Sequence, residues 1–87
     1  MAEPDRKDKL AEVFDLYRGP MLRLAFRVLG NERDAEDAVQ DAFERIVRNL
    51  DRLDQPDSPK TRGYIMVITE RRAIDLLRAR RRQHRLS

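Results

Sequence analysis

The last third of the chain carries a basic segment whose side chains are suited to binding phosphate. Residues 58–87 contain nine lysines and arginines against two acidic residues, a net charge of +7. Arginine dominates the set, and its planar guanidinium presents paired donors that match phosphate oxygens. The segment therefore predicts contact with nucleic acid, unless it is only a solvated basic tail. The basic residues are Lys60, Arg62, Arg71, Arg72, Arg78, Arg80, Arg81, Arg82 and Arg85.

One aromatic residue, Tyr64, lies among the first of these cations, just after Lys60 and Arg62. An aromatic ring within a basic surface can stack on an unpaired base, a contact worth about 1–3 kcal/mol. Helical spacing equally allows Tyr64 to be a core residue with its hydroxyl at the surface.

Residues 34–50 combine an apolar stripe with a dense acidic face. Their apolar positions recur every three or four residues, which is typical of an amphipathic helix. Residues 1–57 carry 14 acidic and 10 basic residues, a net charge of −4, so the two parts of the chain differ in sign. Such polarity indicates two partners of different charge. The residues of the polar face are Asp34, Glu36, Asp37, Gln40, Asp41 and Glu44.

The sequence contains no arrangement typical of an enzyme. It has no Gly-rich phosphate loop, no metal-ligand spacing and no nucleophile beside a base. Cysteine is absent, and the single histidine, His84, lies in the basic tail. We therefore expect no enzymatic activity, no metal and no cofactor.

No apolar run approaches the roughly 20 residues that cross a bilayer, and the N-terminus lacks the hydrophobic core of a signal peptide. We expect a cytoplasmic protein without membrane insertion.

Three helices must position these residues in one small all-α domain. The first is expected to start near Asp5 or Asp8 and to stop at Gly30. A kink or a short break is expected at Gly19-Pro20, because proline lacks the backbone donor of a helix interior. Beyond it the apolar stripe widens, so this half should be more deeply buried. The residues that widen the stripe are Leu22, Phe26 and Leu29.

The second helix is expected to be capped by Asn31 or Asp34. After it, residues 51–60 are rich in proline and aspartate and predict a loop.

The third helix is expected to have Ser58 as its N-cap and Pro59 at its first position. It should run to about Arg82, with the last residues fraying. Residues 64–68 resemble a buried strand locally, but no other segment could pair with a strand. A helix that is apolar all round there should be enclosed by the other two.

Four segments, in order along the chain, resemble region 2 of a bacterial sigma factor of the sigma-70 family, nearest to the extracytoplasmic-function (ECF) class. The resemblance covers about residues 10–82 and implies a compact, all-α bundle of three main helices. The segments read Leu-Tyr-Arg (16–18) with Leu-Arg-Leu-Ala-Phe-Arg-Val-Leu-Gly (22–30), Asp-Ala-Glu-Asp-Ala-Val-Gln-Asp-Ala-Phe (34–43), Arg-Gly-Tyr-Ile-Met-Val-Ile-Thr (62–69) and Ala-Ile-Asp-Leu-Leu-Arg (73–78).

The resemblance implies that the acidic helix binds RNA polymerase, at the clamp-helix coiled coil of its largest catalytic subunit. An acidic face meeting a basic coiled coil is electrostatically complementary. Without the resemblance, an ordinary solvated face would explain the same residues. The polymerase-binding candidates are Asp37, Gln40, Asp41 and Glu44.

The resemblance also implies that the loop before the last helix captures a base flipped from the non-template strand of the −10 promoter element. The start of the last helix then helps to hold the strands apart, and its exposed side follows the DNA. The binding energy must offset the cost of unstacking the base, a few kcal/mol. The DNA-binding candidates are Asp54, Gln55, Asp57, Ser58, Lys60, Arg62, Tyr64, Arg71, Arg72 and Arg78.

Two of these positions depart from the family's usual pattern. Tyr64 stands where the family usually has tryptophan, which alters stacking, and Arg71 stands where it often has asparagine. An arginine there exchanges base readout for phosphate contact, or changes the base preference.

The expected organisation is a region 2-like domain over residues 1–82 and a basic tail, the start of an interdomain linker, over 83–87. The second helical domain of such factors, which reads the −35 element, is absent from this sequence. An excised domain is the favoured explanation, ahead of an unusual one-domain protein.

The leading hypothesis is a module that recognises and opens the −10 element during transcription initiation. The alternative is a helical protein-interaction domain without sequence-specific DNA binding, held by an anti-sigma factor or acting as a degenerate sigma-like adaptor. A weaker third hypothesis is a non-specific basic nucleic-acid binder.

Overall fold

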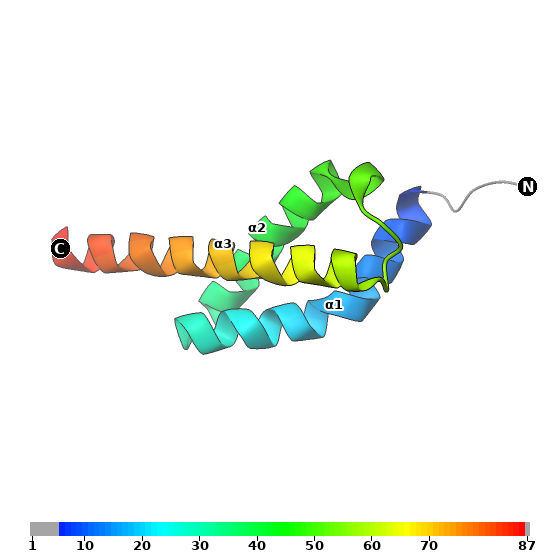
Figure 1. Ribbon diagram of the computed structural model, residues 1–87. Helices are drawn as coiled ribbons and strands as arrows, with labels where there is room; N and C mark the ends of the chain where they lie inside the picture. The colour runs from blue at the N-terminus through cyan, green and yellow to red at the C-terminus, as the bar shows by residue number, and fades with distance from the viewer. Residues whose placement is uncertain (1–5, 87) are drawn as a thin grey trace, which may run out of the picture.

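A computed structural model describes residues 6–86, which form three long helices and a short helical turn. The helices are α1 (Arg6–Leu29), α2 (Glu32–Arg48) and α3 (Pro59–Leu86), and η1 (Leu50–Arg52) is a turn of 3-10 helix after α2. No strand occurs among the described residues, which confirms the all-α prediction. In Figure 1, α1 and α2 lie against the first part of α3, and the orange and red end of α3 extends beyond them.

The helix ends follow the capping signals in the sequence. Gly30 ends α1 with a φ of 68°, a left-handed conformation that glycine adopts without strain. The Asn31 side chain caps α2 by accepting a hydrogen bond from the backbone N–H of Asp34 at 3.0 Å. Ser58 caps α3 in the same way, since its Oγ accepts from the N–H of Thr61 at 3.1 Å. Asn31, rather than Asp34, is therefore the cap of the second helix.

Pro20 lies inside α1, and the helix runs through it without a break. Figure 1 shows α1 changing direction between its dark-blue start and its cyan end. This agrees with the predicted kink, because proline removes one backbone hydrogen bond and its ring displaces the preceding turn.

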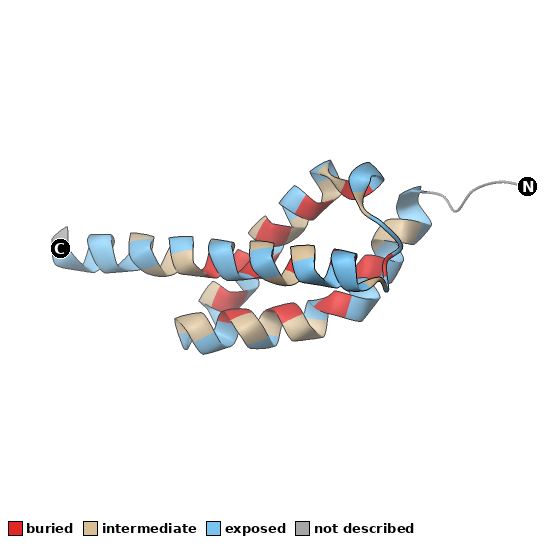
Figure 2. Ribbon diagram, viewed as in Figure 1, coloured by how far each residue is buried: buried red, intermediate tan, exposed pale blue. Residues whose placement is uncertain are grey.

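The core lies where the three helices meet, and it is rich in small side chains. Figure 2 shows the buried positions on the facing sides of the helices. Alanines on α2 let the backbones approach closely, and two buried threonines of α3 bond to the backbone or to Ser58. The buried apolar residues are Val13, Tyr17, Met21, Ala25, Ala35, Ala38, Val39, Ala42, Ile46, Leu50, Ile65 and Ala73.

Two predictions of deep burial were wrong. Phe26 is 46% exposed, because the widened stripe of α1 exceeds the surface that its neighbours cover. Val67 is 53% exposed, because α1 and α2 pack against one side of α3 and do not enclose it.

Two predicted boundaries also differ. Residues 51–52 belong to η1 and α3 begins at Pro59, so the loop covers 53–58. The third helix continues past Arg82 to Leu86, since no glycine or proline follows Gly63 to stop it.

Candidate protein and nucleic-acid interfaces

The loop over residues 53–58 is fastened to α1 through its backbone. The ammonium of Lys9 donates to the Leu53 carbonyl at 2.8 Å, and the buried Tyr17 hydroxyl donates to the Pro56 carbonyl at 2.5 Å. Pro56 is itself buried. The path of the loop is therefore set by two side chains of a helix about 40 residues earlier in the chain.

Fixing the backbone leaves polar side chains of the loop at the surface. Asp54, Gln55 and Asp57 are exposed, and Asp54 Oδ1 accepts a hydrogen bond from the Gln55 N–H at 2.8 Å. Ser58 differs from them, because its hydroxyl is occupied in capping α3. Of the four loop candidates, Ser58 has a clear structural role.

Two hollows flank the loop. One, of about 380 Å³, lies between the start of α1 and residues 53–56 and is lined by Asp54 and Gln55. The other, of about 310 Å³, lies between the middle of α1 and the start of α3. Its apolar walls carry one carboxylate and one guanidinium, so a planar group could enter and be hydrogen-bonded. The lining residues of the second hollow are Leu16, Tyr17, Pro20, Asp57, Arg62 and Met66.

Arg62 and Tyr64 have different neighbours, although the sequence places them together. Arg62 is exposed beside the α1 residues of the second hollow. Tyr64 is half-buried, and its hydroxyl accepts a hydrogen bond from Asn49 Nδ2, at the end of α2, at 3.3 Å. Lys60 is exposed. The structure thus brings Arg62, but not the Tyr64 hydroxyl, to the hollow beside Asp57.

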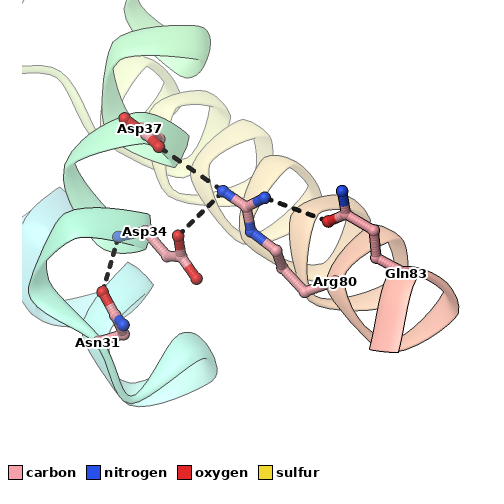
Figure 3. A network of polar contacts seen from close by, with 5 residues as sticks. All are labelled: Asn31, Asp34, Asp37, Arg80 and Gln83. Atoms are coloured by element: carbon pink, nitrogen blue, oxygen red, sulfur yellow. Dashed lines mark hydrogen bonds and ion pairs between the residues drawn. The ribbon is translucent and has the colours of Figure 1, made fainter. Parts of the chain in front are cut away.

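The acidic face of α2 is divided between two environments. On the edge that faces α3, Arg80 lies 3.2 Å from Asp34 and 4.0 Å from Asp37, as Figure 3 shows. Farther along this edge, Arg72 lies 3.7 Å from Asp41. Three carboxylates of this acidic face are therefore paired with arginines of α3.

Arg72 is held more tightly than the other arginines discussed. Its guanidinium also lies 3.0 Å from Asp75 on its own helix, and its side chain is only 22% exposed. Its Nε is buried without a hydrogen-bond partner. Arg72 was predicted to bind DNA, but the structure places it at the contact between α2 and α3.

The opposite edge of the α2 face borders apolar hollows between α1 and α2. Gln40 and Glu36 line one of about 340 Å³, whose walls include Phe14 and Phe43 with ring centroids 5.2 Å apart. A larger one of about 610 Å³ extends along α1 past Phe26. Glu44 is exposed and takes no part in the ion pairs of α2 with α3. The polymerase-binding candidates thus lie across the face of α2, from the edge that is ion-paired with α3 to the edge that borders the apolar hollows.

The basic residues late in α3 remain exposed. Arg71, Arg78, Arg81, Arg82 and Arg85 are exposed, and the end of α3 that carries the last of them extends beyond the other helices in Figure 1. These side chains lie on one continuous helix that reaches Leu86. The basic surface is lined by Arg78, Arg80, Arg81, Arg82, His84 and Arg85.

Within residues 6–86, no group of three or more histidine, cysteine or acidic side chains could hold a metal ion. None of the described helices is both long and apolar enough to cross a membrane.

Sequence reasoning missed the roles of Lys9, Tyr17 and Asn49. Their partners lie in other elements, and no local pattern marks a hydrogen bond across such a separation. The opposite charges of the two helices indicated that α3 would pair with α2. Charge alone does not determine that Arg80 is the arginine that pairs with Asp34.

Comparisons with known proteins relate this architecture to bacterial transcription factors. The family model described as Sigma-70 region 2 matches residues 13–83. The ECF RNA polymerase sigma factor SigW of Bacillus subtilis is 40% identical over 48 residues, which cover 55% of this chain and 26% of that protein. The probable ECF RNA polymerase sigma factor SigI of Mycobacterium tuberculosis is 32% identical over 72 residues, covering 83% of this chain and 23% of the relative.

A third relative, the ECF RNA polymerase sigma factor SigE of Mycolicibacterium smegmatis, is 38% identical over 60 residues, or 69% of this chain and 22% of the relative. The chain thus spans about a quarter of the length of these relatives. No solved structure matches it at a comparable level.

Proposed function

This chain belongs to the sigma-70 region 2 family, and from that membership we propose that it is the promoter-recognition module of an ECF sigma factor. The module acts by binding alone and carries out no chemistry. It docks on RNA polymerase through α2, in the cytoplasm, and engages the single-stranded −10 element through the loop and α3. Together these contacts direct transcription initiation and help to open the promoter.

The observation that carries the proposal is the separation of charge between two helices. Acidic side chains are frequent on α2, while exposed arginines are spread along α3, with Arg62 nearest the loop. Opposite charges on different elements allow a basic protein surface and a phosphate backbone to bind at the same time. Electrostatic complementarity of this kind guides partners to the correct surface.

On the polymerase side, we assign the contact to Asp37, Gln40, Asp41 and Glu44. Glu44 and Gln40 are exposed, so a basic coiled coil can reach them without disturbing the bundle. Asp37 and Asp41 are paired with arginines of α3. The approaching partner therefore has to displace these arginines or share the carboxylates with them.

On the DNA side, the hollow beside Arg62 and Asp57 can receive a flipped base. Its volume of about 310 Å³ exceeds that of a nucleobase, and its apolar wall and two polar groups suit a planar heterocycle. Lys60, Arg71 and Arg78 are exposed on α3 and are available to phosphates of the DNA.

Binding to a clamp-helix fragment of the largest polymerase subunit tests the docking surface. Glu44→Lys reverses an exposed charge, and we expect it to weaken binding by about tenfold or more. Isothermal titration calorimetry measures the affinity. Lysine at position 41 would be a poorer test, because it would face Arg72 and disturb the packing of α3.

The matched control is Glu70→Lys, the same charge reversal at an exposed position on α3. If Glu44→Lys binds the fragment as tightly as Glu70→Lys does, the assignment of the α2 surface is wrong.

One observation favours a second candidate function. Phe14 and Phe26 are 44% and 46% exposed beside the apolar hollows of α1 and α2, and such patches commonly bind proteins. A helical interaction domain held by an anti-sigma factor would use this surface and would bind no specific DNA sequence. Sequence-selective binding of oligonucleotides separates the two functions.

A further inference from the structure

Arg80 is a cation of α3 that lies against the acidic surface of α2. Its Nη2 is 3.2 Å from Asp34 Oδ1 and 4.0 Å from Asp37 Oδ2, and its Nη1 is 3.4 Å from Gln83 Oε1 (Figure 3). Asp34 and Asp37 are three residues apart and lie on the same side of α2, so one guanidinium reaches both. The continuation of α3 beyond its contacts with the core brings Arg80 to this position.

Asp37 therefore has an internal counter-cation. Any basic group that binds Asp37 from outside meets a carboxylate whose charge is partly neutralised by Arg80. The side chains of Arg80 and Asp37 are 48% and 56% exposed, and ion pairs at such exposure are weak and easily exchanged. The contact is weak enough for a partner to displace and close enough to compete with it.

We propose that Arg80 is a built-in competitor for the basic partner of the α2 surface. In the free chain it occupies Asp34 and Asp37. When a lysine- or arginine-bearing helix docks on α2, the partner's cation takes over Asp37, and Arg80 keeps Asp34 alone. This inference rests on the proposed docking of α2, and it adds that the chain itself limits the affinity of that docking.

A competing Arg80 and a supporting Arg80 predict opposite effects of its removal on the affinity for a basic partner. If Arg80 competes, its removal makes the acidic surface more negative and tightens binding of a basic partner. If Arg80 instead holds Asp37 in a productive position, its removal weakens binding. Arg72 is less suitable for this test, because it is largely buried and is also paired with Asp75.

The experiment compares Arg80→Ala with Arg81→Ala for binding to the clamp-helix fragment at low ionic strength. Both residues are exposed arginines of α3, so both variants lose one positive charge, and Arg81→Ala reports the effect of lost charge alone. We expect Arg80→Ala to bind about twofold to fivefold more tightly than Arg81→Ala. Circular dichroism checks that both variants remain helical.

Comparing Arg80→Ala with Arg81→Ala in chains that also carry Asp37→Asn tests whether Arg80 acts through Asp37. Without the carboxylate, Arg80→Ala should lose most of its advantage, because a double-mutant cycle isolates the coupling between the two residues. The advantage should also shrink at high salt, where exposed charges are screened.

The outcomes separate the inference from the function on which it rests. If the unaltered chain binds the fragment but Arg80→Ala binds no more tightly than Arg81→Ala, Arg80 is not a competitor and the docking proposal stands. Weaker binding by Arg80→Ala also overturns the inference, in favour of a positioning role. If the unaltered chain fails to bind the fragment, both the docking proposal and the inference are wrong.

Discussion

At the scale of single residues, side chains of α1, outside the loop itself, decide the position of the loop. Lys9 and Tyr17 hold the backbone of residues 53–58, and the exposed polar side chains of the loop follow from that. Tyr17 is buried on the apolar side of α1. Its hydroxyl bond could not be predicted, because the partner, Pro56, is remote in sequence and the bond depends on how the loop returns to α1.

We expect Tyr17→Phe to destabilise the domain by about 1–3 kcal/mol, because the variant leaves the buried Pro56 carbonyl without its donor. Tyr64→Phe is the matched control, since it removes the same hydroxyl from a longer, partly buried contact with Asn49 at 3.3 Å. Its cost should be smaller, below about 1 kcal/mol. Urea denaturation measures both, and equal losses would contradict a special role for Tyr17.

At the scale of elements, the capping residues were predictable and the depth of burial was not. Ser58, Pro59 and Gly30 act through their own backbone geometry, so their signals are local. Phe26 and Val67 belong to stripes whose burial depends on how much surface the neighbouring helices cover. Three helices of unequal length leave part of each stripe uncovered, and spacing alone does not reveal which part.

The cap of α3 gives a prediction at this scale. Ser58→Ala should cost about 0.5–2 kcal/mol of stability, because the Thr61 N–H loses its acceptor. Ser58→Asp should keep most of the stability, since aspartate caps a helix comparably. Thermal unfolding measures the stability of the two variants. If Ser58→Asp loses as much stability as Ser58→Ala, the hydroxyl does more than cap the helix.

At the scale of the whole molecule, the charge separation visible in the sequence is real but partly neutralised. The acidic and basic segments fold onto each other, so Arg72 and Arg80 pair with carboxylates of α2. The sequence predicts one acidic and one basic helix. The way in which α2 and α3 pack together determines which arginine pairs with which carboxylate. Among the candidates on α3, Lys60, Arg62, Arg71 and Arg78 remain exposed.

Binding of the chain to short single-stranded oligonucleotides, with each base changed in turn, tests the central claim most directly. Fluorescence anisotropy should detect a preference for particular bases, and Arg62→Ala should weaken it, because Arg62 lines the hollow proposed to receive the base. Arg33→Ala removes the same charge from an exposed position on α2 and should leave the preference intact. Equal affinity for every sequence, or no binding at all, would contradict the account of this chain as a promoter-recognition module.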